Sequence, residues 1–139
     1  VRTPCREQWG VLVREDSELA SRERVSPADL ASVPLILPER EIVQNELLNW
    51  FGPYAEGLRI TATGNLLYNL ASLARASGGS VLTLNLDCTY EGLRFIPLSP
   101  PLESNTVLVW KKTQTFSAAA AALIEFSEKY ISGMEQNLI

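Results

Sequence analysis

The sequence predicts an α/β domain in which helices pack on the faces of a mostly parallel sheet. Two strand–helix pairs lead to this expectation. Residues 33–38 form a proline-bounded apolar strand, and a helix with apolar residues at helical spacing follows at residues 41–51. A second strand at residues 58–63 precedes an amphipathic helix that stops at Gly78, and a buried strand follows at residues 81–84. Short strand–helix–strand connections of this kind build parallel sheets covered by helices.

The amino-terminal elements have local signals of their own. Residues 8–14 are apolar and rich in β-formers, which indicates a strand. Ser26, Pro27 and Asp29 match a helix start, because serine caps, proline suits the first turn and the acid completes a capping box. This helix must be brief, since the strand at residues 33–38 follows at once.

The carboxyl-terminal third predicts two strands and a long helix. Residues 92–96 alternate like a half-buried strand, and residues 106–111 form a further apolar strand. Ser117 is placed to cap a final helix over residues 117–131, whose alanine run has high helix propensity. The tail at residues 132–139 is expected to fray.

The composition excludes several function classes. The chain has 139 residues, a formal charge of −4 and no histidine, so it lacks the commonest general base and metal ligand. The negative charge argues against a grip on nucleic-acid phosphates, and no apolar run is long enough to cross a bilayer. We expect no enzyme, no cofactor, no metal site and no membrane contact. Cys5 and Cys88 lie far apart, which favours a reduced, cytoplasmic protein.

Two loops follow predicted parallel strands and precede predicted helices, so they are the candidate binding site. Glu39 and Arg40 lie in the first loop, and Thr63, Gly64 and Asn65 lie in the second. The carboxyl ends of parallel strands are where α/β proteins place their ligands, and helix starts attract anions. Arg40 would grip a carboxylate, Thr63 and Asn65 offer donors, and Gly64 lets a ligand approach the backbone. No catalytic residue is predicted.

Structural alternatives compete with these roles. Thr63 or Asn65 would also serve simply as the cap of the following helix, a position that both residue types favour. Glu39 and Arg40 would equally form a solvated loop pair.

An ordered series of motifs resembles the effector-binding domain of LysR-type transcriptional regulators. The series begins with a charged turn that ends in Leu-Ala, followed by a capped helix and a Pro-Leu-Ile strand. It continues with a helix, a glycine turn and a strand, and ends with a strand and helix. The matching segments are residues 16–20, 25–30, 33–37, 73–82, 92–98, 108–112 and 118–126. The sequence departs from the family at Glu18, where proline is common, and at the double glycine Gly78-Gly79.

The resemblance implies the carboxyl-terminal part of a periplasmic-binding-protein-like (type II) domain, a mixed, mostly parallel sheet with helices on both faces. Residues 8–14 and 106–111 would be the crossover strands, and residues 33–98 would form the second lobe. The helix at residues 117–131 would normally pack on the first lobe. The first half of the effector-binding domain and the family's DNA-binding domain would be absent from this segment.

The resemblance also implies the function. A small-molecule effector, such as an organic acid, would bind in an interlobe cleft and modulate DNA binding and transcription. Contact with DNA would come only through the DNA-binding domain of the parent protein. The isolated segment is expected to self-associate, because its final helix and crossover strands lack their usual covering. The alternative is a free-standing α/β small-solute-binding or carrier domain unrelated to transcription.

Overall fold

The computed structural model describes residues 1–137, and side chains as far as residue 134. The chain forms two units. Residues 8–103 make up one, here called the sheet unit, and residues 1–7 with those from 104 onward make up the other, the terminal unit. The strands and helices in chain order are β1 (Arg2–Arg14), α1 (Pro27–Ala31), β2 (Pro34–Pro38), α2 (Glu41–Phe51), β3 (Arg59–Gly64), α3 (Leu67–Ser77), β4 (Ser80–Leu84), β5 (Leu93–Pro97), β6 (Glu103–Val107) and α4 (Ala118–Asn137), with 3-10 turns η1 (Glu18–Ser21) and η2 (Gly52–Gly57).

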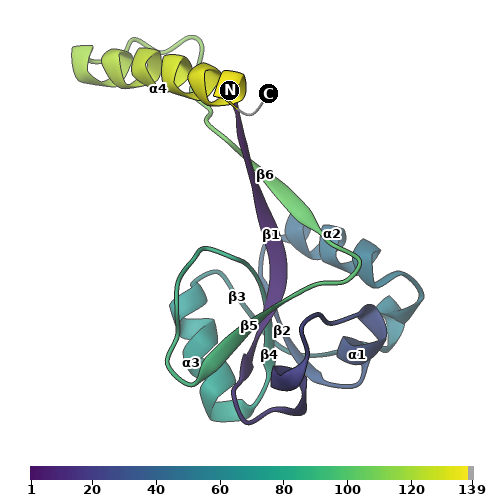
Figure 1. Cartoon of the computed structure of the whole chain (residues 1–139). Helices are drawn as coiled ribbons and strands as arrows, with labels where there is room; N and C mark the ends of the chain where they lie inside the picture. The colour runs from purple at the N-terminus through teal and green to yellow at the C-terminus, as the bar shows by residue number, and fades with distance from the viewer. Residues whose placement is uncertain (138–139) are drawn as a thin grey trace. The chain divides into compact units, whose positions relative to one another are not determined.

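The sheet unit is built on a mixed sheet with the strand order β3-β2-β4-β1-β5 (Figure 1). Strand β2 lies parallel to both β3 and β4, whereas β1 runs antiparallel to β4 and β5. The parallel strands β2, β3 and β4 therefore end at one edge. Trp9 pairs with Leu84, which places the last residue of β4 at this edge beside β1.

Both faces of the central strands β1, β2 and β4 are buried, which explains their runs of apolar residues, whereas the edge strand β3 is largely exposed. Alternate residues of the central strands enter opposite cores. Leu35 and Leu37 join the first core, which α1 and α2 cover, while Ile36 joins the second core under α3. Figure 1 shows α2 and α3 on opposite sides of the sheet. The expected α/β layers with helices on both faces are confirmed.

Local signals set the helix boundaries as predicted. Ser26 Oγ accepts the Asp29 N–H at 3.3 Å, and the Ser26 N–H donates to the Asp29 carboxylate at 2.9 Å, which completes the capping box. This backbone hydrogen bond lowers the pKa of Asp29 below its ordinary value. Helix α3 ends at Gly78, whose φ of +75° is the left-handed conformation that glycine adopts at little cost.

The terminal unit contains the largest departures from the sequence prediction. Strand β1 begins at Arg2 instead of residue 8, and the strand expected at residues 106–111 lies at Glu103–Val107. The extension exists because β1 and β6 pair with each other. Val1 and Leu108 exchange two backbone hydrogen bonds of 2.8 Å, and Thr3 Oγ1 donates to the Thr106 carbonyl at 3.0 Å.

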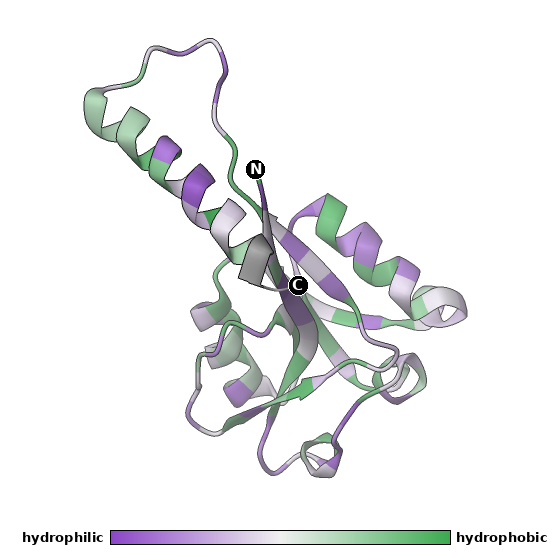
Figure 2. Cartoon of the chain, turned by 45° about the horizontal axis from the view of Figure 1, so that its top comes forward, coloured by the Kyte–Doolittle hydropathy of each residue, from purple (hydrophilic) through white to green (hydrophobic). Residues whose placement is uncertain are grey.

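Helix α4 begins where it was predicted, with Ser117 Oγ accepting the Ala120 N–H at 3.2 Å. It continues through Asn137, so the expected fraying from residue 132 is wrong for residues 132–137, whereas residues 138–139 lie outside the described part. Figure 2 shows the apolar alanine-rich start of α4. Within the described residues, no helix is both long and apolar enough to cross a membrane.

Candidate functional site

The candidate site lies at the edge of the sheet unit where the parallel strands end. The loop after β2 leads directly into α2, and the loop after β3 leads into α3. The two loops are joined, because the Glu39 N–H donates to the Gly64 carbonyl at 2.8 Å. Gln44 Nε2 also donates to the Pro38 carbonyl at 2.8 Å, which ties the first loop to α2. The structure thus brings the two predicted loops together.

A pocket of about 140 Å³ opens between these loops. It is lined by Pro38, Glu39, Arg40, Gly64, Asn65, Leu67, Leu70, Leu82 and Thr83. Four of the five residues predicted from the sequence belong to this lining, while Thr63 does not. Polar groups form the rim of the pocket, and leucines of α3 and β4 form its walls.

Arg40 provides the free positive charge of the rim. It occupies the position before α2, and its side chain makes no capping bond there. Both Glu39 and Arg40 are exposed, and within the described part of the chain the Arg40 guanidinium has no ion-pair partner. Its donors are therefore available to a ligand. Glu39 adds one negative charge beside it.

The start of α3 is uncapped, which contradicts the structural alternative for Thr63 and Asn65. Leu66 occupies the capping position, and no side chain there accepts a hydrogen bond from the helix. Capping by Thr63 or Asn65 is therefore wrong. Asn65 is exposed at the pocket rim, and Thr63 is exposed on β3 and is not part of the lining. The first N–H groups of α2 and α3 both lack a side-chain acceptor and carry the positive end of the helix dipole.

Gly64 has a packing role that the sequence did not reveal. A Cβ atom at this position would lie 2.7 Å from Leu70 Cδ2, which is too close for any real contact. Glycine at this position therefore leaves room for the Leu70 side chain in its present rotamer. Access of a ligand to the Gly64 backbone stays a prediction.

Thr83 is the pocket residue that sequence reasoning missed. It is only 8% exposed, and Ser80 is the other buried polar residue of the described chain. Its hydroxyl donates to the Leu84 carbonyl at 3.2 Å. One sequence signal could have identified Thr83 as a candidate site residue, because it places a hydroxyl within the apolar strand Val81-Leu82-Thr83-Leu84. An aliphatic side chain would pack equally well there, so the hydroxyl calls for another role.

A wider hollow of about 350 Å³ lies beside Arg14, Asp16 and Arg75. Its charged groups are engaged with one another. Arg14 Nε and Nη2 donate to the two carboxylate oxygens of Asp16 at 2.9 and 2.6 Å, and this hydrogen bonding lowers the pKa of Asp16. Arg75 Nη1 donates to the Glu91 carbonyl at 3.1 Å. These contacts hold loops in place, so this hollow is a weaker candidate for ligand binding.

Several solved structures resemble the chain, among them the following three. The effector-binding domain of QuiR in complex with shikimate matches with a TM-score of 0.73 and 17% identity, covering 96% of this chain and 66% of that one. The C-terminal domain of a probable LysR family regulator from Rhodococcus sp. RHA1 gives 0.70 and 22%, covering 89% and 64%. HinK, a LysR family regulator from Pseudomonas aeruginosa, gives 0.67 and 18%, covering 91% and 45%. At these identities the likeness shows the fold alone.

The chain thus spans about two thirds of the solved effector domains and 45% of HinK. No curated protein sequence matches it. The family described as the LysR substrate binding domain, however, matches residues 1–131. The chain therefore belongs to the LysR substrate-binding domain family and has its type II periplasmic-binding-protein-like fold.

Proposed function

We propose that this chain is the effector-sensing part of a LysR-type transcription regulator, and that a small carboxylate binds in the pocket between the loops after β2 and β3. In the complete, cytoplasmic regulator this pocket would line one wall of an interlobe cleft. Ligand in the cleft would favour one of two arrangements of the regulator on DNA. Family membership supports the regulatory role. The single observation that carries the ligand site is the convergence of two uncapped helix starts on one pocket.

The pocket's charges favour an organic acid with one carboxylate. Arg40 offers a fork of donors that matches a carboxylate, and the helix dipoles of α2 and α3 add positive potential. Glu39 lines the same rim and would repel a second acidic group. Glu39 and Arg40 are the only titratable side chains among the lining residues, which supports binding rather than acid–base catalysis. QuiR, whose solved complex holds shikimate, provides a precedent for such a ligand in this fold.

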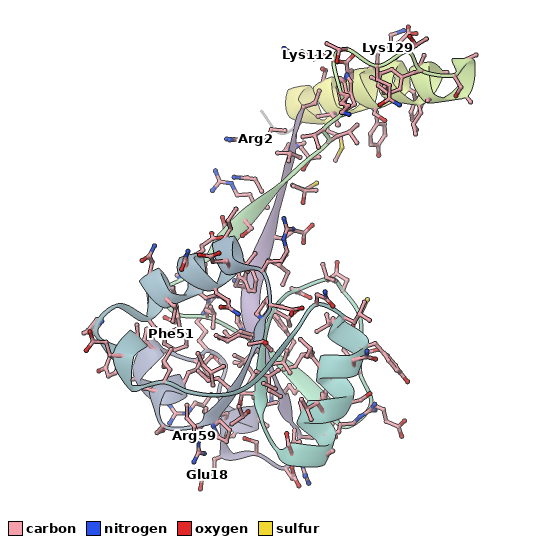
Figure 3. The ribbon with its side chains drawn as sticks, turned by 180° about the vertical axis from the view of Figure 1, so that it is seen from behind. Arg2, Glu18, Phe51, Arg59, Lys112 and Lys129 are labelled. Atoms are coloured by element: carbon pink, nitrogen blue, oxygen red, sulfur yellow. The ribbon has the colours of Figure 1, made fainter. Side chains whose placement is uncertain are left out.

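Arg40→Ala should weaken carboxylate binding by about 10- to 100-fold, because a hydrogen bond to a charged group contributes roughly 1.5–3 kcal/mol. Asn65→Ala should weaken it less. The measurement is calorimetric titration of the chain with benzoate and shikimate. The matched control is Arg59→Ala, which removes an exposed arginine from the opposite end of β3 (Figure 3). If Arg40→Ala binds these carboxylates as tightly as the wild type does, the pocket is not their binding site.

We also propose that the isolated chain self-associates through α4. Leu123, Phe126 and Tyr130 follow one another at helical spacing and are 65%, 66% and 60% exposed. The rings of Phe126 and Tyr130 stack at 6.0 Å, so they present one apolar face. Among the described strands β6 pairs only with β1, which leaves a further edge open in the same unit. A second copy of the chain would cover this face.

Phe126→Glu should weaken self-association at least about tenfold, because a charge would have to be buried in the contact. Sedimentation equilibrium over a range of concentrations measures this effect. Ala121→Glu is the control, since Ala121 is exposed on the opposite side of α4 from Leu123. A wild-type chain that stays monomeric at the highest concentration would contradict the proposal.

A further inference from the structure

We infer that the floor of the pocket, our name for the buried Thr83 in its lining, selects effectors that carry a hydroxyl group, so that the ligand class is a small hydroxylated monocarboxylate. This inference rests on the proposed function, because it assumes that the pocket between the two loops binds the effector. It depends on Thr83, the buried hydroxyl in the pocket lining.

The sheet geometry places Thr83 on the face of β4 that α3 covers. Ile36 of β2 pairs with Val81 of β4, and Pro38 and Thr83, which both line the pocket, each lie two residues further along these parallel strands. Side chains alternate along a strand, so Thr83 lies on the same face as Val81, which belongs to the core under α3. Leu67 and Leu70 of α3 line the pocket as well. Thr83 therefore lines the pocket together with leucines of α3, and it is far less exposed than Glu39, Arg40 and Asn65.

The hydrogen bonding of Thr83 determines which group it would recognise. A hydroxyl has one hydrogen to donate and two lone pairs that accept. The Thr83 hydrogen is directed to the Leu84 carbonyl at 3.2 Å, which leaves the lone pairs for a partner in the pocket. A ligand atom that carries a hydrogen, such as a hydroxyl, satisfies them. A purely apolar group placed there would leave the oxygen without a partner away from water, which is unfavourable.

The exposed and the buried polar groups of the lining are therefore chemically opposite. The rim offers donors, from Arg40 and the first N–H groups of α2 and α3, and binds the carboxylate. The floor offers an acceptor and binds a hydroxyl. The leucine walls between them suit a short carbon frame, and the volume of about 140 Å³ restricts its size. This polarity fixes the orientation of the ligand as well as its class.

The test compares three acids with their hydroxylated partners by calorimetric titration of the chain. The pairs are benzoate with 3-hydroxybenzoate, butyrate with 3-hydroxybutyrate, and cyclohexanecarboxylate with 3-hydroxycyclohexanecarboxylate. The wild type should bind at least one hydroxylated acid about tenfold more tightly than its partner, the effect of one hydrogen bond. Thr83→Val has the same shape without the hydroxyl and should abolish this preference, whereas Thr83→Ser should keep it. Urea unfolding of each variant verifies that the fold is retained.

Each other outcome overturns a specific statement. If both members of every pair bind equally to the wild type and Arg40→Ala weakens both, the proposed function stands and the hydroxyl selection is wrong. If Thr83→Val still binds the hydroxylated acid more tightly than its partner, another residue contacts the ligand hydroxyl and the inference is wrong. If no acid of either series binds the wild type, both the proposed site and its selectivity fail.

Discussion

Phe51→Ala should destabilise the sheet unit by about 3–5 kcal/mol, the usual cost of removing a buried aromatic ring. Phe51 is the last residue of α2 and is 1% exposed. Its side chain belongs to the core between α2 and the sheet, and Figure 3 shows it among the side chains of that layer. The ring also meets Trp50 edge to face, with centroids 5.0 Å apart. The loss would leave a cavity that the surrounding leucines fill only in part.

Urea unfolding followed by circular dichroism measures this effect. Tyr54→Ala is the matched control, because it removes an aromatic ring that lies three residues further along and is 44% exposed. The control should change the free energy of unfolding by less than about 1 kcal/mol. Similar losses in both variants would show that α2 is not anchored by Phe51. Since α2 carries Arg40 at its start, the same loss would also displace the pocket rim.

Gly10→Ala should destabilise the same unit by about 1–3 kcal/mol or more, because the added methyl group overpacks the sheet. A Cβ atom at Gly10 would overlap Phe95 Cζ and would lie 2.5 Å from the Ile96 carbonyl oxygen. The second of these is backbone in the neighbouring strand β5, so a side-chain rotation cannot relieve it. Strand β1 would have to move away from β5.

Thermal or urea unfolding of Gly10→Ala and Gly57→Ala tests this expectation. Gly57 has no atom within 4 Å of its added Cβ, so its substitution controls for the general effect of replacing glycine. Adding Phe95→Ala to Gly10→Ala should recover only part of the loss, since the contact with the Ile96 oxygen persists. Equal stabilities of the two glycine variants would mean that β1 and β5 are more loosely packed than described.

Much of the fold was predictable because its local signals agree with its packing. Helix α2 has the bounds that its apolar spacing and the following Gly52 predicted. The two site loops were found because parallel strands end at a common edge, a rule that needs only the order of elements. The same rule correctly predicted that Arg40 and Asn65, from two different loops, lie close together, and both line the pocket.

The rest depended on tertiary contacts that no local pattern contains. Residues 2–7 lack alternation, and they form a strand only because β6 pairs with them. The sequence predicts that Thr83 lies in a buried strand, but not that the strand's face opens into a pocket. Capping of α3 by Asn65 would require the helix to begin one residue earlier, because Leu66 occupies the capping position in the structure. The sequence alone does not fix a helix start to a single residue.

The hydrogen bond from the Glu39 N–H to the Gly64 carbonyl has a consequence for how new specificities arise. This bond couples the backbone of the loop before α2 to that of the loop before α3, so a displacement of one loop also displaces the other. A related protein that evolves to bind a different inducer would therefore keep this backbone hydrogen bond and change only the side chains of the two loops and the pocket lining. We expect paralogues to diverge at the positions of Arg40, Asn65 and Thr83, while the loop lengths stay constant.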